Sequence, residues 1–283
     1  MPDGIVVCDG TGRITFVNRE AETMTGYGRN ELLGRKVELL VPPSLRAGHI
    51  ARRRNFYREA RAREMGRPDA DFKLRRKDGA VVPVDIALGP VGSHTVAVLR
   101  DMTDRRTMEE ALEHRALHDP LTELANRSLF FDRLRQSIHS ARREDGRVAL
   151  VMLDIDGFKE INDVRGHAVG DQVLKELGGR LGSGLRATDT AARIGGDEFA
   201  WILPRVSSRE SAHRTVVKRL ALVQEPIMIH GRELQIAISA GIAVYPEDGH
   251  DADTLMRHAD SAMYAAKRQG KEVAFHLRRS RKA

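Results

Sequence analysis

Two short acidic stretches contain the residue types best suited to chemistry on a phosphorylated substrate. The first is Asp154-Ile155-Asp156, which follows the continuous apolar run of residues 148–153, and that run predicts a buried strand. Carboxylates at the end of such a strand can hold a hard cation without placing charge inside the core. Mg²⁺ takes oxygen ligands and completes its shell with substrate phosphates, so one or two carboxylates and a carbonyl are enough. For an isolated Asp-x-Asp sequence, a solvated turn is the simpler interpretation.

The second stretch is Arg193-Ile194-Gly195-Gly196-Asp197-Glu198-Phe199, followed by the apolar residues 200–203. Strand-forming residues on both sides of two glycines predict a hairpin with its acidic residues at the tip. Since glycine has no side chain, a triphosphate can approach the main chain closely at Gly195 and Gly196. Asp197 and Glu198 then stand where a metal ion or an attacking hydroxyl could be handled. A plain hairpin is the alternative.

Both stretches belong to a longer ordered series that resembles the GGDEF family of diguanylate cyclases over about residues 117–277. The other matching segments are Asp119-Pro120-Leu121-Thr122, Asn126-Arg127, Phe158-Lys159-x-x-Asn162-Asp163, Gly166-His167, Gly170-Asp171 and Ala262-Met263-Tyr264-x-Ala266-Lys267. The resemblance implies an α+β domain with a central sheet flanked by helices, as in nucleotidyl cyclases. It also implies an enzyme that condenses two GTP into cyclic di-GMP and two pyrophosphates.

The resemblance assigns the acidic residues to catalysis. Asp154, the main-chain carbonyl of Ile155 and Asp197 would hold two Mg²⁺ ions against the triphosphate, and Glu198 would lie close to the reacting 3′-hydroxyl. Asp154, Asp197, Glu198 and Lys267 are therefore the predicted catalytic residues. Lys267 would also neutralise phosphates together with Lys271, which we expect one helical turn further on and which replaces the more usual arginine of the family.

The predicted substrate-binding residues include two that would recognise guanine. A carboxylate at Asp171 can accept from the N1 and N2 hydrogens of guanine, and an amide at Asn162 can donate to O6 or N7. The remaining predicted substrate-binding residues are Phe158, Lys159, Gly195, Gly196, Lys267 and Lys271. We interpret Arg127, Asp163 and His167 as structural.

Two further features concern regulation and stability. Arg186-Ala187-Thr188-Asp189 has a spacing that is usually a surface ion pair, but its offset from the hairpin matches the inhibitory site of the family. We therefore predict that Arg186 and Asp189 bind the product and inhibit the enzyme. Glu123 and Ala125 stand where the family commonly has Gly and Pro, so we expect altered coupling or stability there before any loss of chemistry.

The first hundred residues predict short strands and helices. We expect a hairpin of residues 4–8 and 13–17, a helix over about residues 45–65, and strands over residues 71–76, 80–88 and 94–100. This region resembles a PAS domain, through Asp9-Gly10-x-Gly12-x-Ile14, Asn18, Gly26-Tyr27, Glu31-Leu32-x-Gly34, Arg76-Lys77-Asp78-Gly79 and Asp101-Met102-Thr103. The resemblance implies a five-stranded antiparallel sheet with helices, which regulates the domain that follows. The chain starts almost on the first strand, so the usual preceding helix is expected to be missing.

No residue of this region indicates a particular PAS ligand. Haem is disfavoured because Arg63 precedes Gly66 where haem-binding members carry a histidine. His49 is a conceivable ligand, but a lone histidine on a helix is usually an ordinary residue. Cys8 does not lie in a flavin-type cysteine motif and is interpreted as a small buried strand residue.

A helical connector is predicted between the two regions. Thr103–Leu117 contains no Gly or Pro, and Met108, Ala111 and Leu112 form a narrow apolar stripe along it. We expect it to pair with its copy in a homodimer. The predicted boundaries are residues 1–104 for the PAS domain, 105–117 for the helical linker, 118–277 for the GGDEF domain and 278–283 for a basic tail.

Composition restricts the class of protein. The chain has 283 residues, 41% of them apolar and 31% charged, which is typical of two folded domains. Cys8 is the only cysteine, so an intramolecular disulfide is excluded. Neither a secretory signal nor an apolar run of roughly 20 residues is present, so we expect a cytoplasmic protein without a membrane span.

The net charge of +7 and the pI near 9.8 could indicate a nucleic-acid-binding protein. The densest basic clusters are residues 52–54 and 75–77, and neither is interleaved with aromatic residues, so a solvated charged face is the simpler interpretation. The expected partners are therefore GTP, cyclic di-GMP and a second copy of the chain, and not nucleic acid. A catalytically silent module that binds GTP or cyclic di-GMP is the main alternative, with a DNA-binding regulator third.

Overall fold

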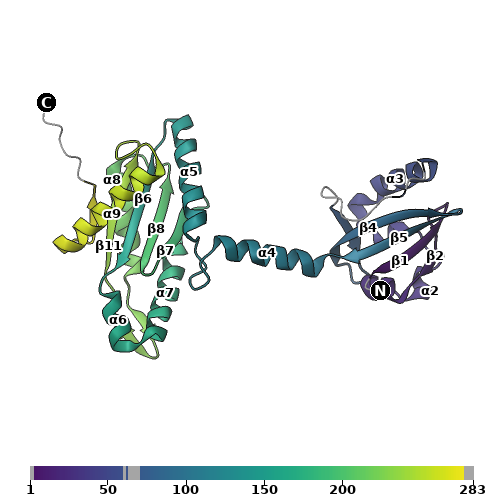
Figure 1. Cartoon of the computed structure of the whole chain (residues 1–283), viewed down its shortest axis with the longest axis horizontal. Coiled ribbons are helices and arrows are strands. Elements are labelled where there is room, and N and C mark those ends of the chain that lie inside the picture. Colours follow the sequence, from purple (N-terminus) through teal and green to yellow (C-terminus); the bar gives the residue numbers. More distant parts are fainter. Residues whose placement is uncertain (1–2, 60–61, 63–70, 277–283) are drawn as a thin grey trace. The chain divides into compact units, whose positions relative to one another are not determined.

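The computed structural model describes residues 3–59, 62 and 71–276 (Figure 1). The chain divides into two compact units, Met1–Leu112 and Glu113–Ala283. Each unit combines one five-stranded sheet with helices, so the predicted α+β class is confirmed. Within the described residues, no helix combines the length and the apolar character that a membrane span requires.

The first unit is built on an antiparallel sheet of strand order β2-β1-β5-β4-β3. The strands are β1 (Gly4–Asp9), β2 (Ile14–Val17), β3 (Phe72–Arg75), β4 (Val81–Val91) and β5 (His94–Asp101). The helices are α1 (Arg19–Thr25), α2 (Arg29–Leu32), α3 (Arg46–Glu59) and the short 3₁₀ helices η1 (Val37–Leu40) and η2 (Pro43–Leu45). The five-stranded antiparallel sheet expected for this region is therefore present.

Alternation along β1 explains which face of this sheet is buried. Val6 and Cys8 point into a core that they share with Ile14, Val17 and Leu99, whereas the residues between them are less buried. Burial raises the pKa of the Cys8 thiol to about 12, so this thiol is a packing group and not a nucleophile.

The predicted helix over residues 45–65 is shorter than expected. α3 begins at Arg46, but its last residue is Glu59, and Ala62 is not helical. The first glycine and proline after Glu59 are Gly66 and Pro68, so neither residue type marks the end of the helix. The sequence pattern alone therefore predicted a helix that was too long. Arg63 and Gly66, on which the expectation of no haem depends, lie outside the described residues.

The connector is helical over the predicted residues. α4 (Thr103–Leu117) leaves Met108 and Leu112 66% and 60% exposed, which is unusual for apolar side chains of this size. An exposed apolar stripe is what pairing with a second copy would need, and that pairing stays a prediction.

The second unit contains a sheet of strand order β12-β11-β6-β8-β7, antiparallel except for the β11–β12 pair. Its strands are β6 (Val148–Ile155), β7 (Thr190–Gly195), β8 (Glu198–Pro204), β11 (Ile238–Tyr245) and β12 (Val273–Phe275). Its helices are α5 (Arg127–Glu144), α6 (Phe158–Arg165), α7 (His167–Gly182), α8 (Arg209–Val223) and α9 (Ala252–Gln269), and β9 (Ile227–Ile229) and β10 (Arg232–Leu234) form a small separate ribbon.

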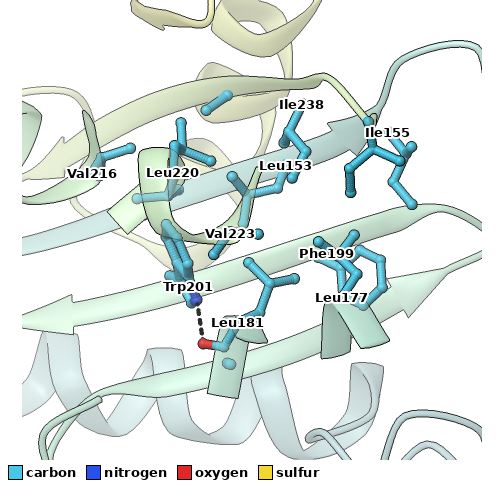
Figure 2. Packing of buried hydrophobic residues seen from close by; sticks show 14 of the residues in the cluster. Leu153, Ile155, Leu177, Leu181, Phe199, Trp201, Val216, Leu220, Val223 and Ile238 are labelled. Atoms are coloured by element: carbon cyan, nitrogen blue, oxygen red, sulfur yellow. Dashed lines mark hydrogen bonds between the residues drawn. The ribbon is translucent and has the colours of Figure 1, made fainter. Parts of the chain in front are cut away.

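Helices cover both faces of this sheet, which is why β6 is apolar at every position up to Leu153. Alternate β6 side chains such as Val151 and Leu153 pack with α7 and α8, and the others, such as Met152, pack with α5 and α9. Figure 2 shows the first of these cores, where the Trp201 indole N–H donates to the carbonyl of Leu181 at 3.1 Å. By the same alternation, Asp154 lies on the face covered by α5 and α9.

The turn before α5 contains one departure from the family pattern, and its backbone shows what that departure costs. Asp119 Oδ1 accepts hydrogen bonds from the main-chain N–H of Thr122 at 2.9 Å and from its hydroxyl at 2.8 Å. The next residue, Glu123, has a φ of 59°, in the left-handed region that favours glycine. The glutamate at this position therefore strains the turn.

Replacing Glu123 with glycine should stabilise the second unit by about 1 kcal/mol, because the left-handed conformation carries no penalty for glycine. The measurement is urea unfolding followed by the fluorescence of Trp201, which is the only tryptophan of the chain and lies in the core of this unit. Glu123→Ala is the matched control, since alanine also removes the side chain but keeps the strain. Equal stability of the two variants would contradict this explanation.

Candidate active site

The acidic end of β6 lies directly beside the acidic start of β8. Asp154 and Glu198 are cross-strand partners in the β6–β8 ladder. Glu198 has the same orientation as Ala200 and Ile202, which pack with α5 and α9, so both carboxylates are on one face of the sheet. Two acidic residues that are 44 positions apart in the sequence are thus adjacent in the fold.

The predicted hairpin is present and is open at its tip. β7 and β8 pair antiparallel, with an irregularity between Arg193 and Gly195. Gly196 has a φ of 50°, and a Cβ added to either glycine would meet nothing within 4 Å. The space over Gly195-Gly196 is therefore free for a ligand to approach the main chain, and Asp197 is half-buried at its edge.

A lysine from α9 extends into the acidic group. Lys267 Nζ donates a hydrogen bond to Asp154 Oδ1 and lies 3.8 Å from Asp156 Oδ1. The bond to Asp154 raises the pKa of Lys267, and the charges of Asp154, Asp156 and Asp197 add to this effect. Asp156 is itself oriented by the hydroxyl of Ser239, which donates to its Oδ1 at 2.9 Å. A fixed positive charge therefore lies among the predicted metal ligands.

Glu198 is in a region of negative potential. Burial raises its pKa, and so do the charges of Asp260, Asp154 and Asp197, while Arg127 acts in the opposite direction. Asp260 was not singled out from the sequence, and Arg127 was interpreted as structural only. The seven-residue spacing of Asp260 and Lys267 on α9, which puts both on one helix face, was the signal that could have identified Asp260.

The raised pKa of Glu198 predicts how stability varies with pH. The folded state keeps the proton of Glu198 to a higher pH than the unfolded state, whose pKa is near 4.5. The destabilisation by Glu198 is therefore absent below the unfolded pKa and complete above the raised folded pKa. Glu198→Gln should be more stable than the parent at about pH 8, by no more than roughly 1 kcal/mol because the group is partly exposed.

This advantage of Glu198→Gln should disappear as the pH falls to about 4, because both forms then lack the charge. Urea unfolding at a series of pH values, followed by Trp201 fluorescence, measures the difference in the free energy of unfolding. An advantage that grows as the solution becomes more acidic would show that the sign is wrong.

One arginine connects the hairpin tip to the turn before α5. Arg193 Nε donates to the carbonyl of Gly196 at 2.9 Å, and its Nη1 donates to Asp119 Oδ1 at 3.1 Å. Because the guanidinium is planar, these two bonds fix the tip against Asp119. This contact between residues 74 positions apart was not predicted, and it gives Asp119 and Arg193 a role in holding the hairpin.

The two predicted guanine-recognising residues are close together. Asn162 is on α6 and Asp171 is on α7, and a Cβ added to Gly170 would lie 2.0 Å from Asn162 Oδ1 and 3.3 Å from the ring of Phe158. Gly170 therefore permits the close approach of Asn162 and Phe158 to the start of α7, next to Asp171. Lys159 is exposed on the same short helix, which begins directly after the acidic end of β6.

The expectation for Lys271 was wrong in one respect. α9 ends at Gln269, and Gly270 caps it with a φ of 61°, so Lys271 does not follow Lys267 by one helical turn. Its main-chain N–H donates to the carbonyl of Ala266 at 3.0 Å, as part of the helix C-cap. Glycine in the left-handed conformation ends the helix, and the position of Gly270 just before Lys271 was the signal for it.

Arg186 and Asp189 lie in one turn beside a groove of about 730 Å³ between α5 and the segment before β7. Asp189 Oδ2 accepts from the main-chain N–H of Arg186 at 3.1 Å and lies 3.6 Å from Arg219 Nη2. The carboxylate is only 5% exposed, whereas the Arg186 side chain is exposed. Asp189 thus shapes the turn, and Arg186 is the more accessible of the two.

The acidic residues at the ends of β6 and β8 can hold Mg²⁺ only if the phosphates of a bound ligand supply further oxygen atoms. Among the described residues, no cluster of three or more His, Cys, Asp and Glu side chains is arranged to hold a metal ion. Asp154 and Asp197 supply carboxylates, and the Ile155 side chain is buried in the core at 1% exposure, so any contribution from Ile155 is its carbonyl. Mg²⁺ commonly takes few protein ligands and completes its shell with phosphates and water, so this set fits a nucleotide-bound ion.

Comparison with known proteins identifies the family of each unit. Residues 116–273 match the family described as diguanylate cyclase, GGDEF domain, and residues 2–104 match the PAS domain. The chain therefore belongs to the GGDEF family of diguanylate cyclases and carries a PAS domain in its first unit.

Curated relatives share both units or the second one. The probable diguanylate cyclase DgcE of Escherichia coli is 35% identical over 95% of this chain, which covers 25% of DgcE. Diguanylate cyclase TpbB of Pseudomonas aeruginosa is 37% identical over 72% of this chain and 47% of TpbB. The cyclic di-GMP phosphodiesterase PdeR of Escherichia coli is 32% identical over 94% of this chain and 40% of PdeR. The chain thus spans from a quarter to about half of the length of these relatives.

Solved structures resemble the second unit. The coiled coil and GGDEF domain of DgcB from Caulobacter crescentus, in complex with cyclic di-GMP, is 32% identical, with a TM-score of 0.55 over 61% of this chain and 92% of that chain. The GGDEF domain of TpbB from Pseudomonas aeruginosa is 40% identical, with a TM-score of 0.55 over 56% of this chain and 94% of that chain.

Proposed function

We propose that this chain is a Mg²⁺-dependent diguanylate cyclase that condenses two GTP into cyclic di-GMP and two pyrophosphates. The observation that supports this most strongly is the pairing of Asp154 with Glu198 across β6 and β8, beside the open glycine turn and Asp197. A family member that had lost catalysis would be expected to lack some of these acidic residues, and all three are present.

The metal site would use Asp154, the carbonyl of Ile155 and Asp197. When bound, Mg²⁺ would neutralise charge on the triphosphate and lower the pKa of the attacking hydroxyl. Lys267 places a positive charge beside Asp154, where it can turn toward a phosphate. Glu198, whose pKa is raised by burial and by neighbouring carboxylates, would accept the proton of a 3′-hydroxyl.

Substrate recognition would use the corner between α6 and α7. Asn162 and Asp171 would bind the guanine edge, with Phe158 and Lys159 beside them on α6. Lys271 is exposed after the α9 cap and can still contribute charge toward phosphates, although not from the helix itself. Adenine would leave the carboxylate of Asp171 without its donors, so ATP should be a poor substrate.

The reaction would need two copies of the chain. The 3′-oxygen of one GTP attacks the α-phosphorus of the other, and pyrophosphate leaves. The two nucleotides then exchange roles, and the same step releases a second pyrophosphate and closes the ring. The second unit of each copy would hold one GTP, so the distance between the second units of the two copies controls the rate. The PAS domain and α4, with its exposed Met108 and Leu112, would set this distance in a homodimer. Arg186 and Asp189 would bind the product and inhibit the reaction.

The test is to incubate the purified chain with GTP and Mg²⁺ and to separate the nucleotides by chromatography. We expect cyclic di-GMP, with two pyrophosphates released for each cyclic di-GMP formed. The rate per mole of protein should rise with protein concentration as dimers form. The second candidate is a catalytically silent module that binds nucleotide without turnover. The observation that favours it is the similarity to PdeR, which is named a phosphodiesterase and not a cyclase. Saturable GTP binding without any product at every protein concentration would establish that candidate instead.

A further inference from the structure

The PAS unit contains a small groove whose lining is mostly basic. It has a volume of about 350 Å³ and lies between the start of β2, the segment leading into η1, and the start of α3. Its lining residues are Arg13, Arg35, Lys36, Glu38, Leu39 and Arg46. Four of these six side chains carry a positive charge.

Three of the four cations of the groove donate to main-chain carbonyls. Arg13 Nη1 donates to the carbonyl of Gly34 at 2.7 Å, and Arg46 Nε donates to the carbonyl of Val41 at 3.1 Å. Lys36 Nζ likewise donates to a main-chain carbonyl, that of Thr11. In the part of the chain that the structure describes, none of the four cations has a carboxylate within the 4.0 Å of an ion pair. Main-chain carbonyls orient these groups without cancelling their charge. Asp9 offsets part of it, since its pKa is lowered by a hydrogen bond from Thr11 and, to a smaller degree, by the charge of Lys36.

The single acidic side chain of the groove, that of Glu38, is paired with a residue outside the groove lining. Glu38 is 7% exposed, and its Oε1 accepts from Arg53 Nε at 2.9 Å. The same oxygen lies 3.2 Å from Nδ1 of His49. Because Arg53 offsets the charge of Glu38, the groove keeps an excess of positive charge.

The main chain holds the basic side chains in place before any ligand binds. Arg13 and Lys36 are partners in an antiparallel bridge. The N–H of Ile14 donates to the carbonyl of Arg35 at 2.9 Å, and the N–H of Val37 donates to the carbonyl of Gly12 at 3.0 Å. Arg46 is the first residue of α3, and a helix start adds a partial positive charge. Groups fixed in this way lose little freedom on binding an anion.

We propose that this groove binds a small multivalent anion through its phosphate or carboxylate groups. Guanidinium groups pair with such anions through two parallel hydrogen bonds, and three arginines and a lysine converge here on a volume that suits a small molecule. Bringing together like charges that are only partly offset destabilises the free unit, and an anion would relieve that repulsion. The site belongs to the PAS unit, so it is independent of the proposed cyclase activity.

Isothermal titration of the full chain with citrate and with inorganic phosphate tests this inference. The protein and buffers are passed over a chelating resin to remove metals, so that no soluble polycarboxylate competes, and the ionic strength is matched with sodium chloride so that general screening cancels. We expect saturable binding of at least one anion, which also identifies whether carboxylate or phosphate is preferred. Arg13→Gln and Arg46→Gln should each weaken it by roughly tenfold, because each removes a charge-assisted hydrogen bond.

The matched control is Arg19→Gln, which removes the same charge from an exposed position of the same unit outside the groove. It should leave the affinity unchanged. If either groove variant fails to fold by circular dichroism, Lys36→Gln takes its place. No saturable binding of either anion, or a loss of affinity in Arg19→Gln as large as in the groove variants, would overturn the proposal.

Discussion

Replacing Asp154 with asparagine should abolish cyclic di-GMP formation, with kcat lowered by roughly a thousandfold or more. Asp154 is the carboxylate on which the site converges: it pairs with Glu198 across the sheet and accepts the hydrogen bond of Lys267. Its loss would remove a proposed metal ligand and leave Lys267 without the carboxylate that accepts its hydrogen bond. The measurement is the rate of product formation at saturating GTP and Mg²⁺.

The matched control for this prediction is Asp132→Asn, which makes the same change at an exposed residue of α5 whose carboxylate contacts only Gln136 among the hydrogen bonds of the described residues. It should retain full activity. Binding of cyclic di-GMP by Asp154→Asn should also survive, since the product site proposed at Arg186 and Asp189 is separate from the acidic residues. Turnover by Asp154→Asn within tenfold of the parent would refute the assignment of this carboxylate.

The second large effect is expected at Gly241, where β11 passes close to α9. A Cβ at this position would lie 2.1 Å from the carbonyl oxygen of Ala259 and 2.1 Å from the main-chain nitrogen of Met263. Since both are main-chain atoms, α9 itself would have to move. Gly241→Ala should therefore destabilise the second unit by about 3 kcal/mol or more. It should also lower activity, because α9 carries Lys267.

Gly179→Ala is the control for Gly241→Ala. Gly179 is inside α7, where an added Cβ would meet nothing within 4 Å, so the helix propensity of alanine should stabilise the unit by up to about 1 kcal/mol. The same substitution is thus expected to have opposite signs at the two positions. Urea unfolding followed by Trp201 fluorescence measures both, and destabilisation of similar size at both positions would contradict the packing explanation.

Local features of the site could be predicted from the sequence because they depend on neighbours in the chain. The apolar run of β6 sets the position of Asp154, and the two glycines set the hairpin tip and Asp197. The end of α9 could also have been predicted, since Gly270 is a typical helix-ending residue. The sequence pattern of residues 45–65 contains no such signal at Glu59, and the length of α3 was accordingly wrong.

Contacts between distant segments could not be predicted in this way. The pairing of Asp154 with Glu198 depends on the register between β6 and β8, which no local pattern specifies. The bridge from Arg193 to Asp119 and the influence of Asp260 on Glu198 depend on side chains meeting across the fold. Periodicity identifies which face of an element is buried, but it does not identify which residue of another element lies opposite.

The concentration of negative charge at the site has a physical consequence for the protein. Asp260, Asp154 and Asp197 all act on Glu198 in the same direction, and Arg127 and Lys267 offset part of this charge. Such an arrangement lowers stability in the free protein, and it favours binding of cations together with a nucleotide. The strained turn at Glu123 adds to the instability of the same unit without contacting the acidic group.

The most direct test of the metal-binding role of these acidic residues is a crystal structure of the chain with Mn²⁺ and a non-hydrolysable GTP analogue, with the metal located by its anomalous scattering. We predict manganese in contact with the carboxylates of both Asp154 and Asp197 and with phosphate oxygens over Gly195-Gly196. Manganese held by the phosphates alone, or a nucleotide bound elsewhere with Lys267 still paired to Asp154, would contradict it.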